Sequence, residues 1–236
     1  MTKSIKMGKS EIFKMEHKKS LEERIAKLRN ILSKDELENK ILNLFILSLI
    51  EHGKDKNQMR QIALISKILA ESLGHDDLYC ARLENAAWIY DIGNVMIDQE
   101  IYAKDEKLTF EEFNIVKSHT TIGAIILQKQ GFPVTKLASI ISAEHHEWWD
   151  GGGYPEQNKN NDINIASRIV AIADTVGALS RKRPGRKVWE YDKIVKYIES
   201  RSGIQFDPNV VEVFLANKDK IRDILSIDLE NIPNRL

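Results

Sequence analysis

Apolar side chains recur every three or four positions along most of the chain, which is the spacing of an amphipathic helix. Proline does not interrupt this pattern in the first half of the chain, since the first of the five prolines is Pro133. The pattern therefore predicts an all-α fold. The predicted helices lie at 20–30, 33–51, 57–74, 77–90, from 109, and at 119–130, 134–146, 165–180, 189–201 and 208–216.

Three of the predicted helix starts carry the pattern of a capping box, in which a Ser or Thr is followed three residues later by Glu. They are Ser20 with Glu23, Ser33 with Glu36 and Thr109 with Glu112. Residues 52–56 are predicted to form a turn and residues 92–108 an irregular segment. The one long loop, 150–164, is rich in Gly, Asn and Asp. Long loops inside compact domains are more often functional than not, which makes this loop a candidate for part of a site.

Composition narrows the class of protein. Hydrophobic residues make up 42% of the chain, which is enough for a sizeable core, and 35 basic residues balance 35 acidic ones. This balance argues against a binder of duplex nucleic acid. No apolar run approaches the ~20 residues of a membrane span, and the basic N-terminus lacks the apolar segment of a signal peptide. A single cysteine, Cys80, excludes an intramolecular disulfide, and we expect a cytoplasmic protein.

Histidines and carboxylates mark the candidate chemistry. His145 and His146 are adjacent at a predicted helix end, just before a glycine-rich loop. Asp91 follows a buried-looking helix, His119 begins another, and Asp174 stands in an otherwise apolar helix, where an unpaired carboxylate is costly. Imidazoles and carboxylates together are ligands for Mn, Fe, Zn or Ni.

With these residues the sequence resembles the HD-GYP family, a branch of the HD-domain metal-dependent phosphohydrolases that typically hydrolyse cyclic di-GMP. The family's Gly-Tyr-Pro motif is Gly153, Tyr154 and Pro155, and the resemblance extends over residues 41–216. It implies an HD-domain helical bundle with a long glycine-rich loop and a short N-terminal helical extension. We therefore expect a tail and short helices at 1–40 and an HD-GYP-like domain at 41–236.

Three positions depart from the family's pattern. Gln58 stands where the family has an early His, Tyr90 where it has the His of the HD pair, and Asn94 where it has a Lys. His52 is the only plausible substitute for the early His. By the resemblance, one metal would use the intact set Asp91, His119, His145 and His146. The other metal would be left with Gln58, Tyr90, Asp91 and Asp174, which include no imidazole.

The resemblance thus implies one well-held divalent transition metal (Fe, Mn, Zn or Ni), with Asp91 and Asp174 as the catalytic carboxylates. It places ligand phosphates near the Gly153–Pro155 motif and near Arg183 and Arg186, since Arg binds phosphate bidentately. Trp148 and Trp149 are candidates for stacking on guanine, with burial in the core as the alternative.

These observations predict a module that binds cyclic di-GMP or a related cyclic dinucleotide, with reduced or lost phosphodiesterase activity. One alternative is an active phosphodiesterase that produces pGpG or GMP. Another is a protein-interaction module with a relic site. Diguanylate cyclase proteins are candidate partners, and the apolar helix at 35–51 either packs on the domain or mediates a homodimer.

Overall fold

The computed structural model describes residues 23–26, 33–102, 104, 106–182 and 187–226. Within these ranges the chain is helical and forms no β-strand, which confirms the predicted all-α fold. Of the helix predicted at 20–30, only residues 23–26 are described, and they are helical. The elements are α2 (Lys34–Glu51), α3 (Lys56–Ser72), α4 (Asp77–Ala87), η1 (Ile92–Met96), α5 (Gln99–Tyr102), α6 (Phe110–Lys117), α7 (His119–Gln128), α8 (Pro133–Glu144), η2 (Asn160–Asp162), α9 (Ile165–Leu179), α10 (Tyr191–Ser200), α11 (Pro208–Ala216) and α12 (Lys218–Ser226).

The predicted capping boxes at Ser33 and Thr109 are both present, and the one predicted at Ser20 lies outside the described residues. Before α2, the Glu36 carboxylate accepts the backbone N–H of Ser33 at 3.1 Å. Before α6, the backbone N–H of Glu112 donates to Thr109 Oγ1 at 3.2 Å, and Glu112 accepts the Thr109 N–H at 2.9 Å. These side chains satisfy amide groups that the first turn of a helix leaves unpaired, so both helices begin where the sequence predicts.

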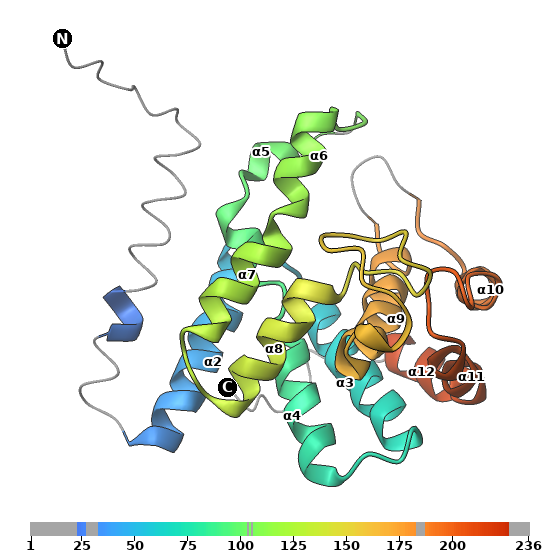
Figure 1. Ribbon diagram of the computed structural model, residues 1–236, viewed down its shortest axis with the longest axis horizontal. Coiled ribbons are helices and arrows are strands. Elements are labelled where there is room, and N and C mark those ends of the chain that lie inside the picture. Colours follow the sequence, from blue (N-terminus) through green and yellow to red (C-terminus); the bar gives the residue numbers. More distant parts are fainter. Residues whose placement is uncertain (1–22, 27–32, 103, 105, 183–186, 227–236) are drawn as a thin grey trace.

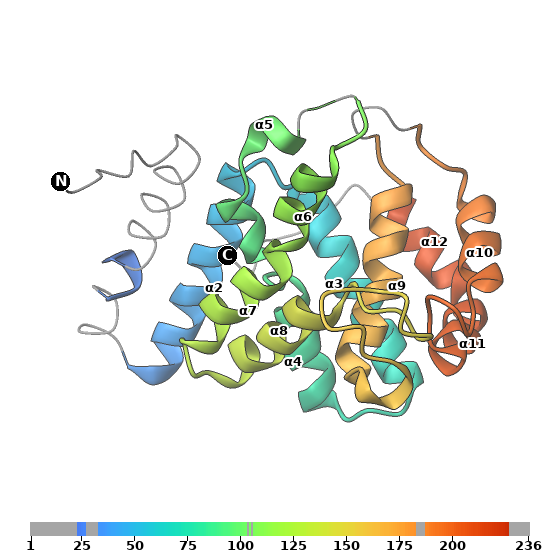
Figure 2. The ribbon, with the colours of Figure 1, turned by 45° about the horizontal axis from the view of Figure 1, so that its top comes forward.

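The helices pack around one core (Figures 1 and 2). α7 and α8 lie side by side, α3 packs against α4 and α9, and α8 also contacts α4 and α9. α10, α11 and α12 gather at the end of the molecule opposite α2. Fully buried Ile65 and Leu69 of α3, Leu83 of α4 and Ile172 of α9 belong to this core. The core holds the ends of α4, α7 and α8 close together.

Two features differ from the sequence-based prediction. The segment predicted to be irregular at 92–108 contains the short helices η1 and α5. The helix α12 was not predicted. Its buried side chains, Ile221 and Ile224, stand among charged residues, which makes the apolar pattern too short to recognise. Contacts with α3 stabilise it, including a hydrogen bond from Gln61 Nε2 to the Leu225 carbonyl at 3.5 Å.

Among the helices that the structure describes, none combines the length and the apolar character required to cross a bilayer.

Candidate metal centre

Three imidazoles meet where α7 begins and α8 ends. His119 is the first residue of α7, His145 caps the C-terminus of α8, and His146 follows it. One ligand nitrogen from each ring lies within 4.8 Å of the others. His119 and His145 are buried, with 3% and 4% of their surface exposed. The structure therefore brings together three of the histidines that the sequence predicts to be ligands.

Backbone carbonyls orient two of these rings. His119 Nδ1 lies 2.6 Å from the Val116 carbonyl oxygen, and His145 Nδ1 lies 3.0 Å from that of Ile141. Since a carbonyl oxygen only accepts, Nδ1 carries the proton in the neutral form of each ring, and Nε2 then has a lone pair for a metal. The two Nε2 atoms are 3.3 Å apart. This is the tautomer that a metal-ligating histidine needs.

Asp91 adds a carboxylate to the cluster. Its Oδ1 lies 3.3 Å from His119 Nε2 and 3.7 Å from His145 Nε2, and this buried oxygen has no hydrogen-bond partner. Ligand atoms that lie about 2.0–2.2 Å from one tetrahedral ion are about 3.3–3.6 Å from one another, close to the separations of Asp91 Oδ1 from the two Nε2 atoms. A buried oxygen without a donor, facing two imidazole lone pairs, fits a divalent transition metal. Asp91, His119, His145 and His146 are thus a suitable set of donors for one ion.

Charge and burial keep these donors in the forms that bind metal. Burial alone would raise the pKa of Asp91, but the Lys54 ammonium outweighs it and holds that pKa well below its usual range, and His119 and His145 add to this effect in their protonated forms. Burial lowers the pKa of His119, and lowers that of His146 well below its ordinary value of 6.5.

A close backbone contact brings Asp91 up to the imidazoles. The helix η1 follows Asp91 directly and packs on α7. A Cβ atom at Gly93 would lie 1.9 Å from the His119 carbonyl oxygen and 2.7 Å from the Gly123 nitrogen. Only glycine permits this approach, and it therefore sets the distance between Asp91 and His119.

The Gly153–Pro155 motif lies against the same cluster. The Tyr154 N–H donates to the His146 carbonyl at 3.1 Å, and the two rings are 4.8 Å apart. A Cβ at Gly153 would be 2.3 Å from the Trp148 nitrogen. The Tyr154–Pro155 peptide bond is cis. The motif therefore forms one wall of the candidate centre.

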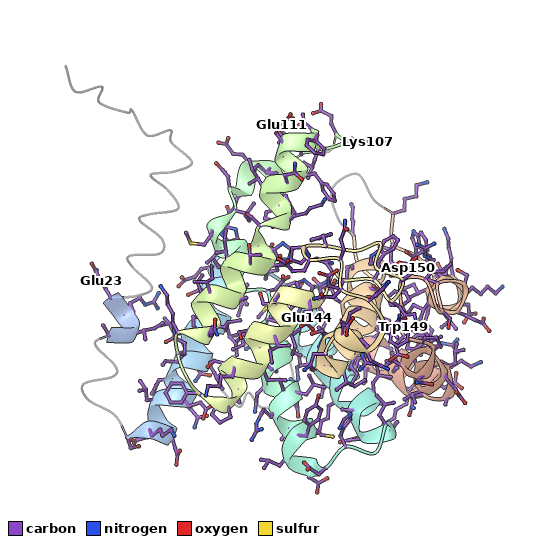
Figure 3. The ribbon with its side chains drawn as sticks, viewed as in Figure 1. Glu23, Lys107, Glu111, Glu144, Trp149 and Asp150 are labelled. Atoms are coloured by element: carbon purple, nitrogen blue, oxygen red, sulfur yellow. The ribbon has the colours of Figure 1, made fainter. Side chains whose placement is uncertain are left out.

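Hydrogen bonds at both ends of the long loop hold it in place. Figure 3 shows Glu144 at the end of α8 and Trp149 and Asp150 on the loop beside α9. The Glu144 carboxylate accepts the Asn164 N–H at 2.8 Å, where the loop enters α9. The backbone N–H groups of Trp149 and Asp150 donate to carbonyls of residues 205 and 204, at 3.1 and 3.0 Å.

Two of the residues that depart from the family's pattern, Gln58 and Tyr90, lie together beside Asp91 and Asp174. Gln58, Tyr90, Asp91 and Asp174 line one small cavity of about 20 Å³, and the Tyr90 hydroxyl donates to Asp174 Oδ1 at 2.8 Å. Lys54 lines the same cavity and donates to Asp91 Oδ2 at 2.6 Å. On this side of Asp91, the Lys54 ammonium therefore binds the second carboxylate oxygen.

Sequence reasoning missed Lys54, which it assigned only to a turn. The available signal was a lysine directly after Gly53, in a turn between two apolar helices. Such a turn fixes the backbone of the next residue, but the pattern does not indicate which side chain the lysine meets.

Asn94 and His52 have other surroundings. The Asn94 side chain is buried, donates to the Asp91 carbonyl at 2.9 Å, and accepts the Tyr102 hydroxyl. It therefore stabilises the turn that presents Asp91. His52 lies on the wall of a larger cavity, outside the group of three imidazoles.

Two cavities border the centre. The larger, about 720 Å³, is polar and includes Lys54, Asn94, Tyr102, Arg181 and Lys182 in its wall. The smaller of these two has a volume of about 310 Å³ and is distinct from the 20 Å³ cavity beside Lys54. It is lined by His145, His146 and Asp174 and by the aromatic residues Trp148, Trp189 and Tyr197. The predicted phosphate ligands Arg183 and Arg186 lie outside the described residues.

Acidification is expected to destabilise the metal-free protein. Because burial lowers the pKa values of His119 and His146, the unfolded chain binds more protons than the folded chain below pH about 6.5. The free energy of unfolding should therefore fall between pH 7 and 5.5, by up to about 1.4 kcal/mol per pH unit for each group. Urea denaturation in EDTA measures this slope, and His146→Gln should reduce it. An unchanged slope in that variant would contradict the expectation.

The amino-acid sequence is similar to a known protein family and to proteins of known function. The pattern of a family described as "HD domain" matches residues 46–210. A cyclic di-GMP phosphodiesterase from Thermotoga maritima is 36% identical over 184 residues, which cover 77% of this chain and 50% of that protein. A 3′3′-cGAMP-specific phosphodiesterase 2 from Vibrio cholerae is 34% identical over 162 residues, covering 69% and 31%. The chain thus spans half or less of the length of these relatives.

Among solved structures, the fold is similar to that of an HDG"Y"P protein from Bdellovibrio bacteriovorus, with a TM-score of 0.60. The two chains are 16% identical, and the match covers 96% of this chain and 75% of the other. This likeness shows a shared helical fold.

Proposed function

The chain belongs to the HD-domain family, in its HD-GYP branch, and from this premise we propose that it is a cyclic-dinucleotide-binding module with a single metal. The observation that carries the proposal is the asymmetry around Asp91. On one side, Oδ1 faces imidazoles and has no hydrogen-bond partner, whereas on the other side Oδ2 accepts from Lys54. One oxygen is available to a metal and the other is not.

The metal would be Fe, Mn, Zn or Ni, since the donors are imidazoles and a carboxylate. When bound by Asp91, His119, His145 and His146, it would act as a Lewis acid and lower the pKa of a bound water. The chain itself fixes the donor geometry through carbonyls behind His119 and His145 and through the Gly93 contact. Tyr154, against His146, would limit access of water from the loop side.

The two cavities suit the two parts of a cyclic dinucleotide. Lys54, Arg181 and Lys182 outnumber the one carboxylate in the wall of the larger cavity, Asp55, and this excess of positive charge favours phosphate. Trp148, Trp189 and Tyr197 give the smaller cavity flat apolar faces, which favour a purine base. We propose cyclic di-GMP as the ligand, and a related dinucleotide such as 3′3′-cGAMP as the variant to compare, because relatives carry both names.

Reduced or absent turnover is part of the proposal. Neither Gln58 nor Tyr90 supplies an imidazole, and Asn94 is engaged with the Asp91 carbonyl and Tyr102. A single metal supplies only part of the charge stabilisation that phosphodiester cleavage needs. The loss of one such electrostatic contribution typically costs ~10²–10³-fold in rate. We propose binding with turnover at least ~100-fold below that of the Thermotoga maritima relative.

The alternative is an active phosphodiesterase. It is favoured by the intact cluster of three imidazoles and by the names of the relatives. In that case Asp91 and the cluster would support cleavage with one metal, and Asp174 would act from the opposite wall.

Calorimetry and a turnover assay separate these functions. Mn²⁺-loaded protein is expected to bind cyclic di-GMP with a Kd below ~100 μM, while chromatography detects little pGpG beside the Thermotoga maritima relative in the same assay. Turnover equal to that of the relative, and abolished by His145→Ala, would establish the alternative. Absence of binding to cyclic di-GMP and 3′3′-cGAMP at ~100 μM would overturn both the binding module and the active phosphodiesterase. A protein-interaction module with a relic site would then be the remaining hypothesis.

A further inference from the structure

Lys54 contacts the central carboxylate of the candidate metal centre. Its ammonium lies 2.6 Å from Asp91 Oδ2, across 37 residues of sequence. The Lys54 side chain is 30% exposed and the Asp91 side chain 16% exposed. The pair is therefore a partly buried, charge-assisted hydrogen bond, which is stronger than an ion pair on an open surface.

The backbone of Lys54 is fixed on its N-terminal side. Gly53 has a φ of 90°, its N–H donates to the Ile50 carbonyl at 2.9 Å, and the Lys54 N–H donates to the Leu49 carbonyl at 2.9 Å. These bonds form a Schellman motif that ends α2. The lysine thus emerges from a tight, hydrogen-bonded turn.

The next residue is fixed as well. Asp55 caps α3 by accepting the Gln58 N–H at 2.9 Å, and its other oxygen pairs with Arg181. Lys54 is therefore held between two helix ends, α2 and α3, and its side chain reaches Asp91 from an anchored position.

The space beside this ammonium otherwise has the features of a cation site. Asp91, Asp174 and Gln58 all line the cavity of about 20 Å³. That volume is large enough for about one water molecule. Size alone would admit an ion, but the Lys54 charge in the cavity wall opposes a second positive charge.

We infer that the Lys54 ammonium is the permanent second cation of this centre, bound to Asp91 Oδ2 in the place that a second metal ion would need. It restricts the centre to one metal, held on the Oδ1 side. This inference rests on the single-metal centre proposed above. It extends that proposal by naming the residue that sets the number of metals.

Removal of the Lys54 charge should change the affinity for the one metal on the Oδ1 side of Asp91. An ammonium and a divalent ion on the two oxygens of one carboxylate repel each other across a few ångströms. Lys54→Met keeps the unbranched chain as far as the ε position and removes the ammonium group. We expect it to tighten binding of the first equivalent of Mn²⁺ at least ~10-fold, measured by competition with a chromogenic chelator.

Two matched variants control for position and charge. Lys54→Arg retains the positive charge and should leave the affinity for Mn²⁺ within about threefold of wild type. Lys67→Met removes an ammonium of similar exposure that pairs with Glu84 at 2.8 Å, away from the centre, and should leave the affinity unchanged. A purely positioning role for Lys54 predicts the opposite result, weaker metal binding in Lys54→Met, and that outcome would overturn the inference.

Metal counting provides a second, independent readout. The double variant Gln58→His, Tyr90→His supplies two imidazoles to the 20 Å³ cavity beside Lys54. With Lys54 in place, we expect elemental analysis of this variant still to find one metal per chain. Addition of Lys54→Met should raise this number to two. Circular dichroism establishes that each variant is folded, and the single Lys54 variants decide the question if the multiple variants are not.

The outcomes separate the inference from the proposed function. A wild-type chain that holds no metal after loading overturns the proposed function, and the inference with it. A wild-type chain that holds one metal, with an affinity that Lys54→Met leaves unchanged, overturns the inference alone. Two metals in the double variant that retains Lys54 would also overturn the inference alone.

Discussion

Replacement of His145 by alanine is expected to weaken metal binding at least ~100-fold. His145 lies between the other donors, with its Nε2 3.3 Å from His119 Nε2 and 3.7 Å from Asp91 Oδ1. Residues that only hydrogen-bond to a metal ligand typically contribute 10–100-fold to the affinity for the metal, and a direct ligand contributes at least as much. Titration with Zn²⁺ or Mn²⁺ against a competing chelator measures the change.

A histidine elsewhere in the chain serves as the control for this variant. His75 stacks on Tyr79 with ring centroids 4.3 Å apart and is not part of the imidazole cluster. His75→Ala should leave metal affinity unchanged. Because His145 is buried, circular dichroism must first show that the variant folds. A folded His145→Ala protein with wild-type affinity would mean that the metal is held elsewhere.

The second large effect is expected at Gly93. A Cβ at this position would overlap backbone atoms of α7, at 1.9 Å from the His119 carbonyl oxygen. Backbone atoms cannot move aside as a flexible side chain can, so Gly93→Ala must push η1 away from α7. We expect a loss of at least about 3 kcal/mol in the free energy of unfolding, the upper end of the usual range for overpacking. Urea denaturation monitored by circular dichroism measures this loss.

Gly74 is a suitable comparison, because it follows the end of α3 and has open space around it. Its φ is 85°, and no atom lies within 4 Å of a Cβ built there. Gly74→Ala should therefore cost only the strain of a left-handed alanine, about 1–2 kcal/mol. If Gly93→Ala is no more destabilising than Gly74→Ala, the close contact between η1 and α7 does not determine the distance between Asp91 and His119.

Much of the fold follows from local signals in the chain. The apolar spacing predicts the all-α architecture, and the capping boxes at Ser33 and Thr109 predict where α2 and α6 begin. These signals are reliable because a helix is stabilised by neighbours three and four residues apart and by capping at its own ends. For the same reason α12 was missed, since its stability depends on contacts with α3.

The candidate ligands could also be named from the sequence, because the residues around His145, His146 and Gly153 form a recognisable motif. The motif does not describe how those residues are held. The carbonyls that orient His119 and His145, and the contact at Gly93, appear only in the folded chain. The Gly93 contact joins segments that are distant in sequence, whereas each carbonyl lies three or four residues before the ring that it orients.

Lys54 shows what only the tertiary structure decided. In the sequence it is one lysine in a turn, and its glycine neighbour explains why the turn forms. Its partner Asp91 is 37 residues away, at the start of η1. A turn fixes the local backbone, but the direction in which two helices leave it depends on how their apolar faces pack against the whole core. That packing places an ammonium on one oxygen of Asp91 and leaves the other oxygen facing the imidazoles.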